Sequence, residues 1–113
     1  MLLPNAERAE IDPGKLRGYL LSTTHPIGRF KARFFAALGY SAERWLELEA
    51  DLRLQHLTHD AQAGKATSYG QSFTIRAILN GPNGESAELV SVWFIKPPSS
   101  VPHFVTAYPG DEP

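Results

Sequence analysis

Residues 72–96 read SFTIRAILNGPNGESAELVSVWFIK, and this stretch decides the fold. Its first six residues alternate polar and apolar side chains, which predicts a half-buried β-strand over 72–77. The turn residues Asn80-Gly81-Pro82-Asn83-Gly84 predict a hairpin. The run from Ala87 to Lys96 is apolar on both faces, which indicates a central strand. A Pro-rich loop then leads to a third expected strand over 103–108, and residues 109–113 are expected to form a tail.

Upstream of this stretch the apolar residues recur at helical spacing. Three helices are expected there, over residues 13–21, 27–38 and 42 to about 62. Asp12 and Ser41 are the expected N-caps of the first and third helices, and Gly39 ends the second. The second helix is expected to bury Phe30, Phe34, Ala37 and Leu38. Helices followed by an antiparallel meander predict an α+β fold, with the N-terminal helices on one face of the sheet and a single domain over residues 1–113.

The composition limits the classes of protein to consider. The 113 residues are 42% hydrophobic and 20% charged, which is typical of a folded domain. The absence of cysteine excludes disulfides, thiolate metal sites and cysteine nucleophiles. No apolar run approaches the ~20 residues of a membrane span, and the opening residues are too few for a signal peptide.

The net charge is −1, but its distribution is uneven. The segment Lys15–Tyr40 contains five basic residues and no acidic one. Such a local field attracts phosphate even on a protein that is nearly neutral overall. The alternative interpretation of this segment is a solvated helix face.

Period-2 alternation assigns faces to the three expected strands. The residues expected toward the helices are Phe73, Ile75, Ala77, Val90, Val92, Phe94, Val105 and Ala107. The opposite, open face would then carry Arg76, Ser91, Trp93, Thr106 and Tyr108. Aromatic rings beside hydroxyls and a cation suit stacking on bases and holding phosphate. The alternative is that Trp93 and Tyr108 cover a second small core beneath the Pro-rich loop.

The four histidines do not form a recognisable metal site. His56 and His59 are three residues apart, but no third ligand lies nearby in the sequence, so a position in solvent or at the end of the third helix is expected for both. There is no carboxylate pair, nucleophile motif or glycine-rich phosphate loop either. We therefore expect no metal and no cofactor.

Several motifs along the chain resemble those of a known family. They are Asn5-Ala6-Glu7, Lys15-Leu16, Tyr19-Leu20-Leu21, His25-Pro26-x-Gly28-x-x-Lys31-Ala32, Leu38-Gly39, Tyr69-Gly70, Gly81-Pro82-Asn83-Gly84, Val92-Trp93 and Val105-Thr106-Ala107-Tyr108. The chain resembles, over nearly its whole length, a bacterial domain family of unknown function. Members of that family look like free-standing proteins or the C-terminal tips of secreted toxins, including contact-dependent growth inhibition effectors. The order of elements is also similar to the barnase–EndoU–colicin–RelE (BECR) superfold of metal-free ribonucleases.

The resemblance implies a toxin that cleaves RNA by attack of the adjacent 2′-hydroxyl, a reaction that needs acid–base groups and cations. His25 is the expected acid–base residue, and Lys31 would steady the phosphate at the same helix end. Thr106 and Tyr108 would face them across one cleft as further catalytic groups. The residues expected to hold RNA are Arg29, Arg33, Arg76, Ser91 and Trp93.

Each of these roles has a plainer alternative. His25 before a helix is also an ordinary cap, and Lys31 is also an ordinary surface lysine. His103 ranks below His25 as a catalytic residue, although a two-histidine mechanism would need it.

The resemblance also implies partners and a place of action. The expected substrate is tRNA or another structured RNA, with no DNA and no membrane involved. A cognate immunity protein would cover the cleft, and acidic residues on it would fit the basic segment Lys15–Tyr40. The toxin would act in the bacterial cytoplasm, with delivery as part of a larger effector as one route. The alternatives are a non-enzymatic protein- or nucleic-acid-binding module using the same open face, and a structural or regulatory role without nucleic acid.

Overall fold

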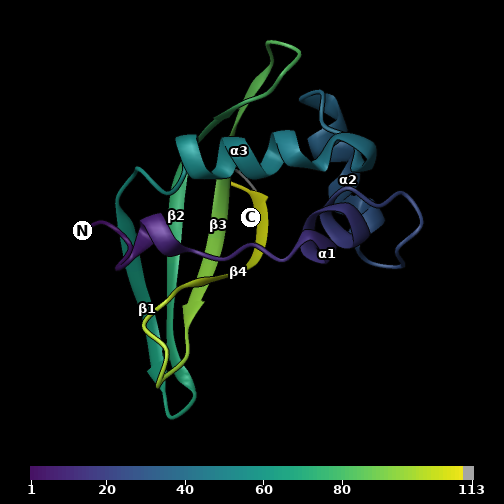
Figure 1. Ribbon diagram of the computed structural model, residues 1–113. Helices are drawn as coiled ribbons and strands as arrows, with labels where there is room; N and C mark the ends of the chain where they lie inside the picture. The colour runs from purple at the N-terminus through teal and green to yellow at the C-terminus, as the bar shows by residue number, and fades with distance from the viewer. Residues whose placement is uncertain (111–113) are drawn as a thin grey trace.

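The computed structural model describes residues 1–110 and has the expected α+β fold, with helices preceding an antiparallel sheet (Figure 1). The expected tail beyond Gly110 lies outside the described residues. The helices are α1 (Pro13–Lys15), α2 (Gly28–Ala37) and α3 (Trp45–Gln55), with short 3₁₀ turns before α1 and before α3. The strands are β1 (Ala61–Thr67), β2 (Gly70–Asn80), β3 (Ser86–Ile95) and β4 (His103–Pro109).

The sheet is a four-stranded meander in the order β1-β2-β3-β4, one strand more than expected. The predicted hairpin joins β2 to β3, which pair without interruption from Gln71↔Ile95 to Asn80↔Ser86. The additional strand is β1, whose sequence AQAGKAT is exposed after its first residue. Because it has neither alternation nor large apolar side chains, β1 gives no strand signal in the sequence. The third helix correspondingly ends at Gln55 and not near residue 62.

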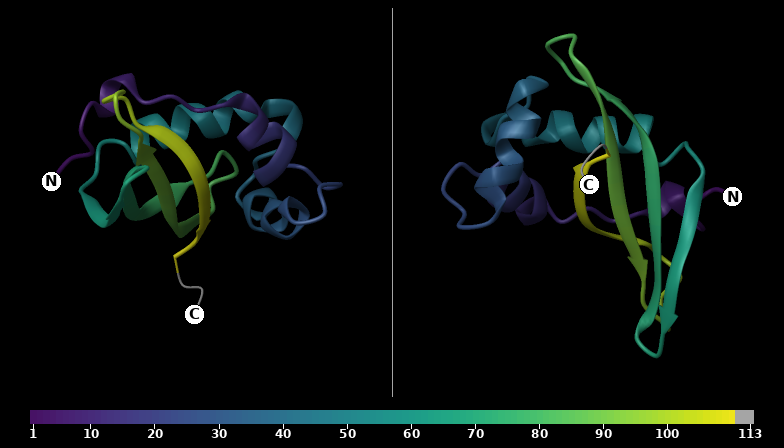
Figure 2. Two further views of the ribbon diagram at one scale, coloured as in Figure 1. Left: turned by 90° about the horizontal axis from the view of Figure 1, so that it is seen from below. Right: turned by 180° about the vertical axis from the view of Figure 1, so that it is seen from behind.

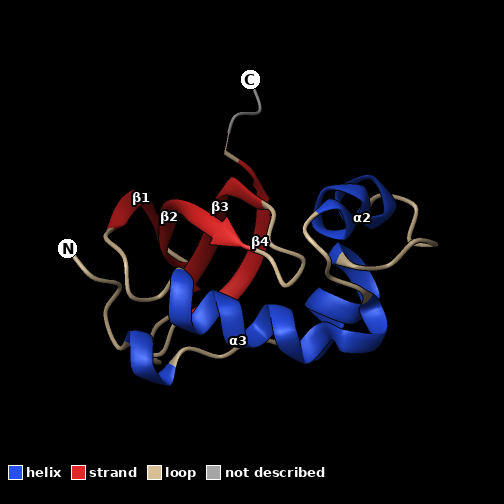
Figure 3. Ribbon diagram, turned by 90° about the horizontal axis from the view of Figure 1, so that it is seen from above, coloured by secondary structure: helices blue, strands red, loops and turns tan. Residues whose placement is uncertain are grey.

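One face of the sheet packs against α3, which crosses it in Figures 1 and 3. Leu48 and Leu52 of α3 are buried in the same core cluster as Ile75, Leu79 and Leu89 of the sheet. Helices α1 and α2 lie beyond the edge strand β4, away from β1, in all the views of Figure 2. The helices therefore cover one face of the sheet and flank one edge.

The predicted alternation of β3 is wrong by one residue. In the pairing of β2 with β3, Phe73 lies opposite Trp93, Ile75 opposite Ser91 and Ala77 opposite Leu89. Directly opposed residues share one face of the sheet, so Leu89, Ser91 and Trp93 point toward the helices. The expected core set Val90, Val92 and Phe94 points away from them. The physical reason is that burying Trp93 removes the larger apolar surface from water. Ser91 and Trp93 are both fully buried, which corrects their assignment to the open face.

In β4, alternation is interrupted by a β-bulge. Val92 pairs with Thr106 and Trp93 pairs with Phe104, which leaves Val105 as the extra residue. Phe104 is therefore buried and Val105 exposed, the reverse of the prediction. Thr106 lies on the open side as predicted, and Tyr108 lies there too, because its pairing partner Val90 belongs to that side of β3.

The second helix begins and ends near the predicted residues but buries a different face. Ala32, Phe35 and Leu38 are in the core, whereas Phe30 is 64% exposed and Ala37 is also exposed. The chain offers aromatic residues at 30, 34 and 35, so two helical phases fit the pattern equally well. Packing selects the phase that buries Phe35. The predicted end of the helix is confirmed, since Gly39 has φ +98°.

Candidate functional site

The first wall of the site comes from the N-terminal helical segment. The carboxylate of Asp12 accepts a hydrogen bond from the Gly14 amide (2.9 Å), which caps α1 as predicted. The helix continues as a π-helical turn over Leu16–Leu20, closed by a 2.8 Å bond from the Leu21 amide to the Leu16 carbonyl. Tyr19 follows Lys15 at the i, i+4 spacing, so both side chains leave the same side of this segment.

The second wall is α2, and glycine fixes its approach. A Cβ on Gly28 would overlap the backbone of Tyr19, so only glycine lets the start of α2 lie directly against the π-helical turn. At the other end of α2, the side-chain amide of Asn83 in the β2–β3 hairpin donates to the Ala37 carbonyl (3.0 Å). Held at both ends, α2 directs Lys31 from its side toward β4.

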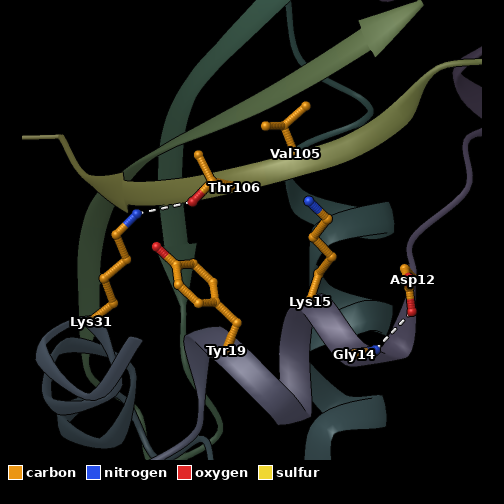
Figure 4. A pocket seen from close by; sticks show the side chains of 7 residues that line it. All are labelled: Asp12, Gly14, Lys15, Tyr19, Lys31, Val105 and Thr106. Atoms are coloured by element: carbon orange, nitrogen blue, oxygen red, sulfur yellow. Dashed lines mark hydrogen bonds between the residues drawn. The ribbon is translucent and has the colours of Figure 1, made fainter. Parts of the chain in front are cut away.

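The third wall is β4, and a hydrogen bond joins it to α2. The Lys31 ammonium donates to the Thr106 hydroxyl at 2.9 Å, and Figure 4 shows Tyr19 and Lys15 reaching toward the same strand. These groups enclose a cleft of about 490 Å³. Its lining residues are Asp12, Gly14, Lys15, Tyr19, Lys31, Val105 and Thr106. The expected pairing of Lys31 with Thr106 across one cleft is thus present.

The cleft is positively charged. Lys15 and Lys31 are its two cations, whereas its carboxylate, Asp12, is already engaged in capping α1. The Lys31 nitrogen lies 5.4 Å from the centre of the Tyr19 ring, within cation–π range. Two ammonium groups beside a phenol and an alcohol form a site for an oxyanion, because every one of these groups donates hydrogen bonds.

His25 is placed next to this cleft but is not among its lining residues. Its ring packs edge-on against Tyr19, with ring centres 4.9 Å apart. Its Nδ1 accepts hydrogen bonds from the amides of Ile27 (3.1 Å) and Gly28 (3.0 Å), which caps the start of α2. A neutral ring with an accepting Nδ1 carries its proton on Nε2. It can then donate a proton from Nε2 but cannot take one up there, so this geometry fits the acid half of the expected acid–base role and not the base half.

The remaining predicted residues lie elsewhere. Tyr108 is two residues further along β4 than Thr106 and outside the lining of the cleft. Arg76 is on the open face, as predicted, but its guanidinium donates to Glu88 (2.6 Å) and to the Gly110 carbonyl (2.5 Å). Arg29 and Arg33 line a second, smaller groove of about 310 Å³ along α2. The structure therefore gathers Lys31 and Thr106 from the predicted set, and separates the others from them.

Lys15 and Tyr19 are the two chemically active side chains of the cleft that sequence reasoning missed. Lys15 was recognised only as part of the basic segment, and Tyr19 had no predicted role in the site. Their four-residue spacing was the available signal, since it places a cation and a phenol on one side of a helical segment.

Ser91 and Trp93 belong to a buried polar chain. The Trp93 indole donates to the Ser91 hydroxyl (2.9 Å), which is 2.8 Å from Nδ1 of His56. Indole is a donor only, so the hydroxyl accepts from Trp93, and it also hydrogen-bonds Nδ1 of His56 in a direction that the tautomer of the imidazole decides. Burial lowers the pKa of His56 to about 4. His56 lies at the end of α3, as one of the two predicted alternatives has it, but it is buried there and not in solvent, whereas His59 is exposed.

Within residues 1–110, no three side chains of His, Cys, Asp or Glu lie together as a metal-binding group would. Within the same range, no helix is long and apolar enough to cross a membrane.

The sequence matches one family. Residues 2–111 match the family described as Domain of unknown function (DUF6883), and the chain belongs to that family. No match was found among curated proteins or among solved structures. The description of the family names no activity, so function is argued from the cleft.

Proposed function

We propose that this DUF6883 domain binds RNA through the cleft between α1, α2 and β4 and cleaves it without a metal ion. The observation that carries the proposal is the Lys31–Thr106 hydrogen bond across a cleft that also contains Lys15 and Tyr19. A phosphodiester in this cleft would meet two cations and two hydroxyl groups. Cations that are fixed in place stabilise the extra negative charge of a pentavalent phosphorane.

The proposed reaction follows from these groups. The 2′-oxygen attacks the adjacent phosphorus while it loses its proton, and the bond from phosphorus to the 5′-oxygen breaks as that oxygen gains a proton. The products are a 2′,3′-cyclic phosphate and a 5′-hydroxyl. Lys15 and Lys31 would hold the phosphate oxygens, and Thr106 would keep Lys31 in position. The Tyr19 hydroxyl would give its proton to the departing 5′-oxygen and receive the proton of the 2′-hydroxyl in its place, so the step leaves the phenol unchanged.

A second candidate function is binding without catalysis, and the geometry of His25 favours it. The histidine expected to supply acid–base chemistry already accepts two amide hydrogen bonds through Nδ1, so it has no nitrogen with which to take the 2′-proton. If Tyr19 does not move protons in its place, the same cationic cleft would hold an RNA or an anionic protein segment without cleaving it. Product analysis separates the two candidates.

The biological role is proposed from the resemblance and from the charge. A metal-independent RNase that resembles toxin tips would act in the bacterial cytoplasm, on tRNA or another structured RNA. Its producer would need an immunity protein, and acidic side chains on that partner would pair with Lys15 and Lys31. Such a partner would inhibit the enzyme by covering the cleft.

The test is digestion of RNA by the purified chain in excess EDTA, followed by analysis of the cut ends. The proposal predicts cleavage that leaves 2′,3′-cyclic phosphate ends, and an intact 2′-O-methyl RNA of the same sequence, because that RNA lacks the attacking hydroxyl. Intact RNA with measurable binding would favour the binding module. Cleavage that stops with EDTA and resumes with magnesium would contradict the proposal.

A further inference from the structure

The outward face of α2 exposes an aromatic side chain where the sequence predicted a buried one. Phe30 is 64% exposed, and the guanidinium carbon of its neighbour Arg29 lies over the ring, 4.9 Å from its centre. An arginine on one face of a ring leaves the opposite face open to another planar group. Exposing a phenyl ring loses the stabilisation that its burial would give, so this position calls for an explanation other than packing.

Beside Phe30 runs a groove of about 310 Å³ along α2. Its lining residues are Thr23, Arg29, Phe30, Ala32, Arg33 and Ala36. At 100° per residue, Arg29 and Arg33 lie on one flank of α2 and Lys31 on the other, with Phe30 on the outward face between them. A chain that crosses α2 at its first turn, between Lys31 and Arg29, therefore passes over the Phe30 ring.

The charge of this surface indicates an anionic occupant. No Asp or Glu occurs between residues 13 and 42, so every charged side chain of α2 is positive, and the carboxylates that line the neighbouring grooves, Asp12 and Glu43, come from outside this segment. Phosphates would find a cation on each flank, separated by roughly the 10–12 Å diameter of a helix. An exposed ring between two cationic positions is the arrangement by which proteins hold single-stranded nucleic acid, because bases stack on the ring while phosphates contact the cations.

We propose that Phe30, with Arg29 and Arg33, forms a nucleotide-stacking subsite for single-stranded RNA that continues from the cleft. This inference rests on the proposed function, since the same RNA must occupy Lys31. RNA is favoured over an acidic protein because the surface is continuous, by way of α2, with the cleft proposed for the phosphodiester. The subsite would make the enzyme prefer an unpaired nucleotide next to the cleavage position.

The test measures binding of two RNA probes that cannot be cut. One is a fluorescein-labelled 2′-O-methyl oligouridylate that is long enough to cross α2, and its binding is measured by fluorescence anisotropy. The other is 2′-O-methyl diuridylate, which is short enough to occupy only the cleft, and its binding is measured by chemical-shift titration. The variants are Phe30→Ala, Phe30→Trp and, as a matched control, Leu54→Ala, because Leu54 is an apolar residue of α3 that is 71% exposed.

Phe30→Ala should weaken binding of the oligouridylate roughly fivefold or more and leave that of diuridylate unchanged. Phe30→Trp should retain binding, and Leu54→Ala should behave as the parent. Parent-like binding by Phe30→Ala, while Lys31→Met binds weakly, would overturn the subsite and leave the proposed function standing. Equal weakening of both probes by Phe30→Ala would also overturn the subsite. A parent that binds polyglutamate and neither RNA probe would overturn both proposals and assign the face to an acidic protein.

Discussion

Two polar clusters of this molecule contain similar groups in different surroundings. In the core, Trp93 donates a hydrogen bond to Ser91, which is hydrogen-bonded to His56, and burial lowers the pKa of that histidine and so favours its neutral form. At the edge of β4, Lys31 and Thr106 form one hydrogen bond, and the cleft around them stays open. The first cluster can only stabilise the fold, whereas the second can exchange its contacts for those of a ligand. Access to solvent, more than residue type, separates the two roles.

The largest effect expected from this comparison follows removal of the indole from the core cluster. Trp93→Ala should destabilise the fold by roughly 3–5 kcal/mol, because it leaves a cavity and removes a partner of Ser91. The exposed aromatic Tyr69 provides the control, and Tyr69→Ala should change stability by less than about 0.5 kcal/mol. Urea denaturation followed by far-UV circular dichroism measures both. Equal free energies of unfolding for the two variants would show that the hydrogen-bonded pair Trp93 and Ser91 does not stabilise the core.

A smaller effect is expected from pH. The pKa of His56 is lowered to about 4 in the folded protein, against about 6.5 when unfolded, so the unfolded chain binds this proton more tightly. Stability should therefore fall as the pH falls from about 6.5 to about 4, by roughly 3 kcal/mol for a shift of this size. Above pH 6.5 this contribution is fully present.

Urea denaturation at several pH values checks this dependence. His56→Phe should remove most of it, and His59→Gln should keep it, because His59 is an exposed histidine close by in the sequence. An identical pH dependence in the parent and in His56→Phe would contradict the assignment.

The sequence predicted those parts of the fold that depend on local chemistry. The hairpin at 80–84, the Asp12 cap and the Gly39 helix end are each set by one or a few residues and are present in the structure. The alternation of β3 was not predictable, because both of its faces are apolar and either one could have faced the helices. Strand β1 has no large apolar residue, so only its pairing with β2 defines it.

The candidate site likewise contains residues that local patterns predicted and residues that only tertiary contacts place. The pairing of Lys31 with Thr106 was predictable because the sequence placed Thr106 on the correct side of β4 and the start of α2 near its observed residue. Ser91 and Trp93 were misplaced because they inherited the error in β3. The contribution of Tyr19 depends on the close approach of Gly28 to its backbone, a tertiary contact that no local pattern reveals.

The most direct test of the account compares cleavage by Lys31→Met and His25→Asn in excess EDTA, with rates corrected for the folded fraction. Asparagine keeps an acceptor for the amides at the start of α2, so His25→Asn should fold and cut RNA within a few-fold of the parent rate. Lys31→Met should fold normally and lose roughly 100-fold or more of the rate, since it removes a cation from the phosphate. Lys65→Met, which removes an exposed cation of β1, is the matched control and should cut as the parent does. Parent-like cleavage by Lys31→Met, or loss of cleavage in a folded His25→Asn, would contradict the account.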